Sequence, residues 1–158
     1  MTRAALAVLL IAACGGGQSG SKGSGSSAPV YLEMTSLAGD PVRLRDMRGQ
    51  PVVLHLFTVG SMSAQMDVLQ LNDAHDAGKV KVLGVALDPH AETLIRAWAE
   101  NAGPKYQVVI GSEDITMGKT DLGAVFAVPT TIVLNSEGVV RFRVDRQLQP
   151  GELERALR

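Results

Sequence analysis

The feature that most restricts the fold is a nearly continuous apolar run, VVLHLF (Val52–Phe57), followed by a small polar corner and a helical pattern. A run of this length without alternation predicts a strand that is buried on both faces. The apolar spacing after the corner predicts a helix over residues 63–77, and a second apolar run predicts another buried strand over residues 80–87. Together these segments predict a parallel βαβ unit with a right-handed crossover.

The remaining segments complete one α/β domain, because 158 residues are enough for one continuous core. The late hairpin must add antiparallel strands to the same sheet. The sequence therefore predicts a mixed central sheet flanked by helices, with an N-terminal β-hairpin. The other expected elements are a leading hairpin (30–34 and 42–44), a helix that buries Leu94, Ile95, Trp98 and Ala102 and stops at Gly103, a short extended piece (106–111), a short helix leading into a strand (120–128), a late hairpin (130–135 and 139–144) and a terminal helix opened by Pro150.

The N-terminal region has the composition of a targeting segment. Residues 1–13 contain one positive charge and then an apolar run that is too short for a permanent membrane span. This run ends in IAAC, which resembles the lipobox of bacterial lipoproteins and implies lipidation of Cys14. The tract 14–29 is rich in Gly and Ser and predicts a flexible tether, so the folded domain is expected over residues 30–158.

Cys14 is the single cysteine of the chain, which excludes an intramolecular disulfide, a Cys-x-x-Cys pair and a cysteine-based zinc cluster. The formal charge of -1 has no basic block, so nucleic-acid binding is not expected. No cofactor is expected either. Gly15 stands where some bacteria use an aspartate to keep lipoproteins at the inner membrane, which favours the outer membrane.

Several stretches resemble the thioredoxin-fold redoxin group, which includes membrane-anchored thiol-disulfide oxidoreductases and AhpC/TSA-type peroxiredoxins. They are PVVLHLFTVGSMSAQMDVLQL, KVLGVALD and FAVPTTIVLNSEGVVRFRV, together with the terminal helix. The resemblance covers residues 30–157 and implies a thioredoxin-like fold. It also implies a cis proline at Pro129 that faces the corner.

The resemblance also shows what this chain lacks. The two cysteine positions of the oxidoreductases align with Ser61 and Ala64, and the peroxiredoxin pattern likewise places Ser61 at the nucleophile. A helix N-terminus can lower a thiol pKa from about 8.5 and create a thiolate, whereas a hydroxyl titrates far higher and has no comparable oxidation chemistry. Ser61 is therefore expected to cap the helix, accepting a hydrogen bond from Ser63 or Ala64.

Two other chemistries would use different residues at the same corner. A serine hydrolase needs a base that is oriented by a third group, and VGSMSA lacks the nucleophile-elbow glycines. The three histidines are expected in a buried strand (His55), on an exposed helix face (His75) and in a loop (His90). Cu(I) could be held by thioethers, with Met62, Met66 and His90 as weak candidates and Met117 nearby, although methionines at helical spacing more often pack the core.

These observations predict a lipid-anchored protein of the bacterial cell envelope, periplasm-facing or at the outer membrane, that binds a peptide or protein partner without catalysing redox chemistry. The alternatives are an oxidoreductase or antioxidant that relies on a partner's thiol, and a Met/His copper carrier. The expected binding residues lie at the corner and at the loop opposite it: Thr58, Ser61, Met62, Val128, Pro129 and Thr130.

Overall fold

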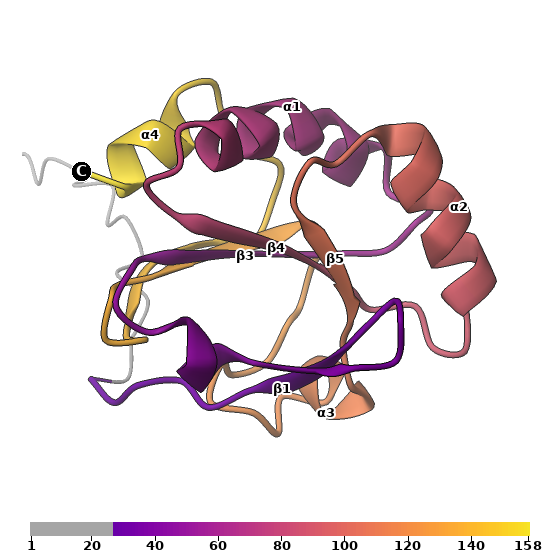
Figure 1. The fold of residues 1–158 in the computed structure, drawn as a ribbon, viewed down its shortest axis with the longest axis horizontal. Coiled ribbons are helices and arrows are strands. Elements are labelled where there is room, and N and C mark those ends of the chain that lie inside the picture. The colour runs from indigo at the N-terminus through magenta and orange to yellow at the C-terminus, as the bar shows by residue number, and fades with distance from the viewer. Residues whose placement is uncertain (1–26) are drawn as a thin grey trace, which may run out of the picture.

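The computed structural model describes residues 27–158 (Figure 1). The expected signal segment (1–13), the lipidation site Cys14 and the tether up to residue 26 lie outside the described residues. The elements are β1 (Glu33–Ser36), β2 (Pro41–Arg43), the 3-10 helix η1 (Leu44–Met47), β3 (Val52–Phe57), α1 (Met62–Asp76), β4 (Lys81–Ala86), α2 (Glu92–Ala102), β5 (Gln107–Ile110), α3 (Glu113–Thr116), β6 (Thr130–Leu134), β7 (Val140–Val144) and α4 (Glu152–Ala156).

The strands form one mixed seven-stranded sheet in the order β2-β1-β5-β4-β3-β6-β7. The expected parallel pair is present, since β3 runs parallel to β4 with Val52 opposite Lys81. The late hairpin adds β6 and β7 antiparallel to β3, and the leading hairpin joins the other side through β1 and β5. The prediction of a mixed α/β sheet with an N-terminal hairpin is confirmed.

The two faces of the sheet are covered differently (Figure 1). Helices α1, α2 and α4 lie on one face, where Val53 and Phe57 of β3 point. The leading hairpin and α3 lie on the opposite side. All six residues of β3 are buried, as the continuous apolar run predicted.

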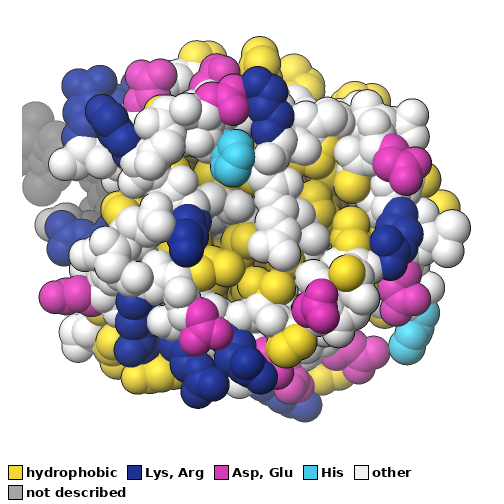
Figure 2. Space-filling model, in the orientation of Figure 1, with side chains coloured by type: hydrophobic (Ala, Val, Ile, Leu, Met, Phe, Trp, Pro, Cys, Tyr) yellow, Lys and Arg dark blue, Asp and Glu magenta, His cyan; other side chains and the backbone are white. Residues whose placement is uncertain are grey.

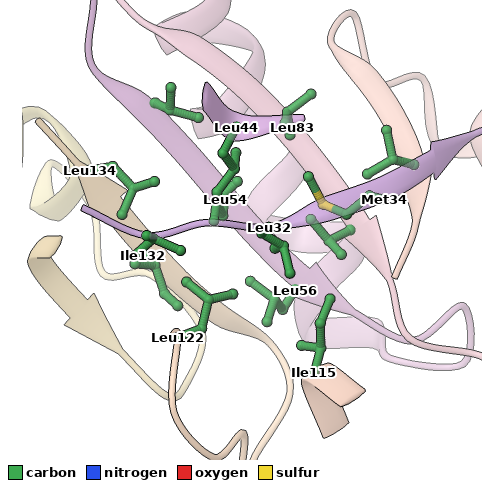
Figure 3. Close-up of a cluster of buried hydrophobic side chains, with 14 of the residues drawn as sticks. Leu32, Met34, Leu44, Leu54, Leu56, Leu83, Ile115, Leu122, Ile132 and Leu134 are labelled. Atoms are coloured by element: carbon green, nitrogen blue, oxygen red, sulfur yellow. The ribbon is translucent and has the colours of Figure 1, made fainter. Parts of the chain in front are cut away.

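The hairpin closes the second core. Leu32 and Met34 alternate with exposed residues, and both pack into the cluster that contains Leu54 and Leu56 of β3 (Figure 3). Alternation with one buried face is the pattern of a half-buried antiparallel strand. The hairpin is therefore an integral layer of the domain.

The sequence-based assignment of the buried face of α1 was wrong. Met62 and Met66 are 70% and 60% exposed, although helical spacing favoured core packing for the methionines. Leu69, on the same face, is 70% exposed. Hydrophobic side chains are visible along the edge of the molecule above this helix (Figure 2). The buried face instead carries Ala64, Asp67, Val68 and Leu71.

Three other local expectations need correction. Leu94 is 61% exposed, while Ile95 and Trp98 are buried as predicted. Residues 120–128 contain no helix, and the short helix in this region is α3, which lies earlier in the chain. The terminal helix begins at Glu152 and not at Pro150. Gly151, which precedes it, has a φ of 68°, in the left-handed region that glycine tolerates.

No helix within residues 27–158 combines the length and the apolar character that crossing a bilayer requires.

Candidate functional site

The corner between β3 and α1 is built around a helix cap. The Ser61 side-chain oxygen accepts a hydrogen bond from the Ala64 backbone N–H at 3.2 Å, and the Ser61 N–H donates to the Thr58 carbonyl at 3.0 Å. Both bonds hold the four-residue corner that links the strand to the helix. The expected capping role of Ser61 is confirmed.

Strand pairing brings the second predicted segment to this corner. Leu56 of β3 lies opposite Thr130 of β6 in the antiparallel pair, so the residues just before β6 lie beside the end of β3. The Val128–Pro129 peptide bond is cis, as the resemblance implied. The structure thus brings together the two segments that carry the six predicted binding residues.

The predicted residues differ in how accessible they are. Met62 and Val128 expose apolar side chains, whereas Pro129 and Thr130 are buried. Phe126, which the sequence reasoning did not single out, is 90% exposed in the same segment as Val128. A contiguous exposed apolar patch can mark an interaction surface, whereas a single exposed apolar residue does not.

The backbone of the segment before Pro129 is also available. In the described part of the chain, no N–H group from Ala124 to Val128 donates a hydrogen bond. Backbone groups without partners can pair with an added extended strand. The segment therefore offers both main-chain groups and apolar side chains to solvent.

Two residues that the sequence analysis did not single out support the site: Asp88 binds the corner, and Asp145 binds the segment opposite it. Asp88 accepts the Val59 N–H at 2.9 Å and so links the corner to the end of β4. Asp145 lies 2.8 Å from the Thr130 hydroxyl, which also lies 2.7 Å from the Ala127 carbonyl. Asp88 directly follows a buried strand, and that position was the available signal for its role.

A buried histidine and a buried aspartate lie between the sheet and α1. His55 is fully buried, and its Nδ1 lies 3.1 Å from the Thr131 hydroxyl. Burial lowers the pKa of His55 to about 4, while the Ala64 backbone acts in the opposite direction. His55 is therefore neutral near pH 7 and enclosed, so it cannot serve as a base for Ser61 at the surface.

Asp67 is the other buried group, on the inner face of α1. Its Oδ1 accepts the Leu148 N–H at 3.1 Å, and its Oδ2 has no hydrogen-bond partner within residues 27–158. Burial raises the pKa of Asp67 to about 7; the Leu148 N–H acts against this shift and the charge of Glu152 adds to it. No sequence pattern pointed to a carboxyl in the core.

The metal candidates are scattered over different elements. Met62 and Met66 lie one turn apart on the exposed face of α1, and Gln147 Nε2 lies 3.8 Å from the Met66 sulfur. His90 is exposed in the loop after β4 with a φ of 55°, and His75 is exposed on α1 as expected. Within residues 27–158, no group of three or more His, Cys, Asp or Glu side chains is arranged to hold a metal ion.

A separate groove of about 740 Å³ lies between α1 and α4. Its walls include Leu69 of α1, Leu153 of α4 and Val80 at the start of β4. Ser61 and Pro129 do not line it. The groove is thus distinct from the corner, which lies where β3 ends.

Several solved structures share this fold. A DsbF homologue from Corynebacterium diphtheriae superposes with a TM-score of 0.72 at 19% identity, covering 85% of this chain and 87% of the homologue. A secreted Mycobacterium tuberculosis disulfide oxidoreductase homologous to Escherichia coli DsbE gives 0.67 at 15% identity, covering 80% and 93%. StoA from Bacillus subtilis gives 0.66 at 17% identity, covering 84% and 100%. At these identities the likeness establishes the thioredoxin-like fold.

Sequence comparison gives a family assignment. No curated protein sequence matches the chain significantly. The AhpC/TSA family profile matches residues 25–143, which is most of the folded domain. The chain belongs to the AhpC/TSA family.

Proposed function

We propose that this protein is a redox-inactive binding module of the bacterial cell envelope, anchored through lipidated Cys14, that holds an extended peptide or protein segment at the corner between Ser61 and Pro129. The carrying observation is that a serine caps α1 where the resemblance implies a reactive cysteine. The same corner retains an opposite segment with exposed apolar side chains and free main-chain groups. The scaffold can bind there without thiol chemistry.

A redox role would require a group that donates electrons. Disulfide exchange requires a thiolate that attacks sulfur, and peroxide reduction requires a sulfur that accepts oxygen. The Ser61 hydroxyl provides neither reaction, and its oxygen already accepts a bond from Ala64. The single cysteine, Cys14, is consumed by the proposed lipidation.

A peptide ligand would be recognised through its backbone as well as its side chains. An extended peptide that adds to an exposed main-chain edge gains hydrogen bonds, and pockets for alternate side chains give specificity. Residues 124–128 supply the main-chain donors, and Phe126 and Met62 supply apolar contacts. We therefore expect a ligand segment that is extended and carries apolar side chains.

The proposed location rests on the N-terminal sequence. One of the structural neighbours is a secreted protein, and the lipobox-like IAAC motif fits export followed by lipid attachment. Several acyl chains hold a protein at a membrane far more firmly than one chain, at about 0.8 kcal/mol per buried CH2. The tract after Cys14 would let the domain reach partners near that membrane.

Binding is tested with short synthetic peptides that carry apolar residues at alternate positions, measured by fluorescence anisotropy on the chain with Cys14→Ser. Met62→Asp and Phe126→Asp are expected to weaken binding at least about tenfold, because each places a charge against an apolar side chain. Leu69→Asp, on the same helix face as Met62 but in the α1/α4 groove, is the matched control and is expected to bind as the parent does. Binding that is lost only with Leu69→Asp would contradict the proposed site.

Copper binding is the second candidate, and the exposure of two thioethers on one helix face favours it over the core-packing interpretation. Stoichiometric Cu(I) binding by the Cys14→Ser chain, lost in Met62→Leu with Met66→Leu, would support a carrier. Binding that persists in the double variant, or no binding at all, would remove this candidate.

A further inference from the structure

The segment between Leu122 and Thr130 is anchored at both ends and open between them. Leu122 is buried in the core, and Thr130 begins β6 fully buried. Between them the chain forms no helix and no strand, and Phe126 is almost completely exposed. An exposed segment without its own hydrogen bonds needs contacts from elsewhere to keep one conformation.

Arg143 of β7 makes those contacts. Its Nη1 donates to the Leu122 carbonyl at 2.7 Å, and its Nη2 donates to the Ala124 carbonyl at 2.6 Å. A planar guanidinium can hold two carbonyl groups in a fixed relative orientation, which a lysine ammonium cannot do. The side chain is only 21% exposed, so these contacts are partly shielded from water.

Asp145 couples the guanidinium to the other end of the segment. Arg143 Nε donates to Asp145 Oδ1 at 3.0 Å, and the same carboxylate oxygen lies 2.8 Å from the Thr130 hydroxyl. The Thr130 hydroxyl also lies 2.7 Å from the Ala127 carbonyl. One network therefore spans the segment from Leu122 to Thr130.

These contacts leave the binding groups of the segment unused. Arg143 takes carbonyls at the start of the segment, and Thr130 approaches the Ala127 carbonyl, while the N–H groups of 124–128 remain without partners in the described part of the chain. Gly118 packs closely against the segment, because a Cβ at this position would lie only 3.0 Å from the Ala124 Cα. The segment is thus held through its carbonyl groups, while its N–H groups have no partner in the described residues.

We propose that Arg143 is the positioning residue for ligand binding: by bridging the Leu122 and Ala124 carbonyls to Asp145, it fixes the conformation of residues 124–128 for main-chain pairing with an apolar peptide. The inference rests on the proposed function and adds the residue that prepares the site in advance. Holding a binding segment in its bound conformation raises affinity because less ordering is lost on association.

The test compares Arg143→Gln with Arg141→Gln, a neighbouring arginine on the same strand whose side chain is exposed. The first readout is the Kd of the apolar peptides described above. The second is the rate of chymotrypsin cleavage after Phe126 in the ligand-free chain, because proteolysis requires local opening of the segment. Arg143→Gln is expected to weaken peptide binding and to accelerate this cleavage, each by about tenfold or more, and Arg141→Gln is expected to change neither.

Arg143→Lys separates positioning from general stability. The lysine keeps the charge beside Asp145 but does not hold both carbonyls in the same fixed geometry. We therefore expect its melting temperature to be closer to that of the wild type than that of Arg143→Gln, while its peptide binding remains as weak as that of Arg143→Gln. Full recovery of both quantities would show that only charge matters and would overturn the inference. If Arg143→Gln fails to fold, Asp145→Asn replaces it, with the same expected losses and the same control.

The two proposals fail in different ways. If the wild-type chain binds no apolar peptide, the proposed function fails, and the cleavage rate after Phe126 still tests the role of Arg143. If the wild-type chain binds and Arg143→Gln binds equally well with unchanged cleavage, the proposed function stands and the positioning role is wrong.

Discussion

At the N-terminus of α1, Ser61 uses its side-chain oxygen to accept the Ala64 N–H. A cysteine at the same position would place its sulfur beside the same N–H group and the positive end of the helix dipole. Both interactions stabilise a thiolate relative to a thiol. The geometry needed to activate sulfur is therefore present, although the residue there is a serine.

Ser61→Cys is accordingly expected to create a thiol whose pKa lies below the ordinary value of about 8.5. Ser136→Cys, in the exposed turn between β6 and β7, is the matched control and should titrate near the ordinary value. Both are made in the Cys14→Ser chain, and the pKa is measured from the pH dependence of alkylation. Equal pKa values in the two variants would show that the corner does not stabilise a thiolate.

Asp67 makes stability depend on pH. Its folded pKa of about 7 lies above the unfolded value of 3.8, so the folded state holds the proton more tightly. Its contribution is most favourable below about pH 4, falls as the pH rises towards 7, and remains low above that. Protons are released on unfolding in this window, because the unfolded carboxyl is already ionised.

Asp67→Asn removes this dependence and keeps an oxygen that can accept the Leu148 N–H. We compare the unfolding free energies of the variant and the wild type by urea denaturation at pH 4 and at pH 8. The difference in favour of the variant should be larger at pH 8 than at pH 4, by up to about 4 kcal/mol, since one pKa unit corresponds to about 1.36 kcal/mol. A gain of equal size at both pH values would mean that Asp67 does not titrate differently in the folded state.

At the scale of elements, α1 shows how a periodic pattern can indicate the wrong face. Met62, Met66 and Leu69 have helical spacing, and so do the smaller residues Ala64, Val68 and Leu71. The buried face of α1 also contains Asp67, and this charged residue interrupts the apolar periodicity by which a buried face is recognised. Small Ala64 lies against the sheet near His55, where a methionine would be too large for close packing.

The two faces of α1 predict opposite responses to the same substitution. Leu71→Ala removes a fully buried side chain and should lower the unfolding free energy by about 2 to 5 kcal/mol. Leu69→Ala, two residues away and 70% exposed, should change it by no more than about 0.5 kcal/mol. Urea denaturation of both variants checks the assignment, and a reversed order would contradict it.

The segment before β6 escaped sequence-based prediction for a different reason. Residues 120–128 were expected to form a short helix that leads into a strand. The segment is instead held by Arg143 and Asp145, which lie about 20 residues later in the sequence. Local pattern cannot reveal a conformation that distant side chains impose.

For the molecule as a whole, long apolar runs and turn residues were sufficient to predict the α/β class, the mixed sheet and the leading hairpin. The resemblance supplied the placement of Ser61 and the cis proline. Phe126 and Arg143 could not be assigned from the sequence alone. Exposure and long-range hydrogen bonds depend on tertiary packing.

The two buried groups act in opposite directions on the acid stability of the folded domain. The pKa of His55 is lowered from 6.5 to about 4, so its contribution is present above pH 6.5 and is lost as the pH falls towards 4. In the wild type, the stability contributed by Asp67 increases as the pH falls from 7 towards 4, and this increase offsets the loss from His55. In Asp67→Asn the offset is gone, so the melting temperature should fall between pH 6.5 and pH 4 more steeply than in the wild type; parallel curves would contradict the assignment.

The central claim is that this member of the AhpC/TSA family binds without donating electrons. The most direct measurement follows disulfide reduction and hydroperoxide consumption by the purified Cys14→Ser chain, with a small-molecule dithiol as the only reductant, no other thiol protein present, and the Ser61→Cys variant assayed in parallel. We predict rates equal to the protein-free background for the Cys14→Ser chain and measurable peroxide consumption once sulfur occupies position 61. Catalytic turnover by the chain that contains no cysteine would contradict the account.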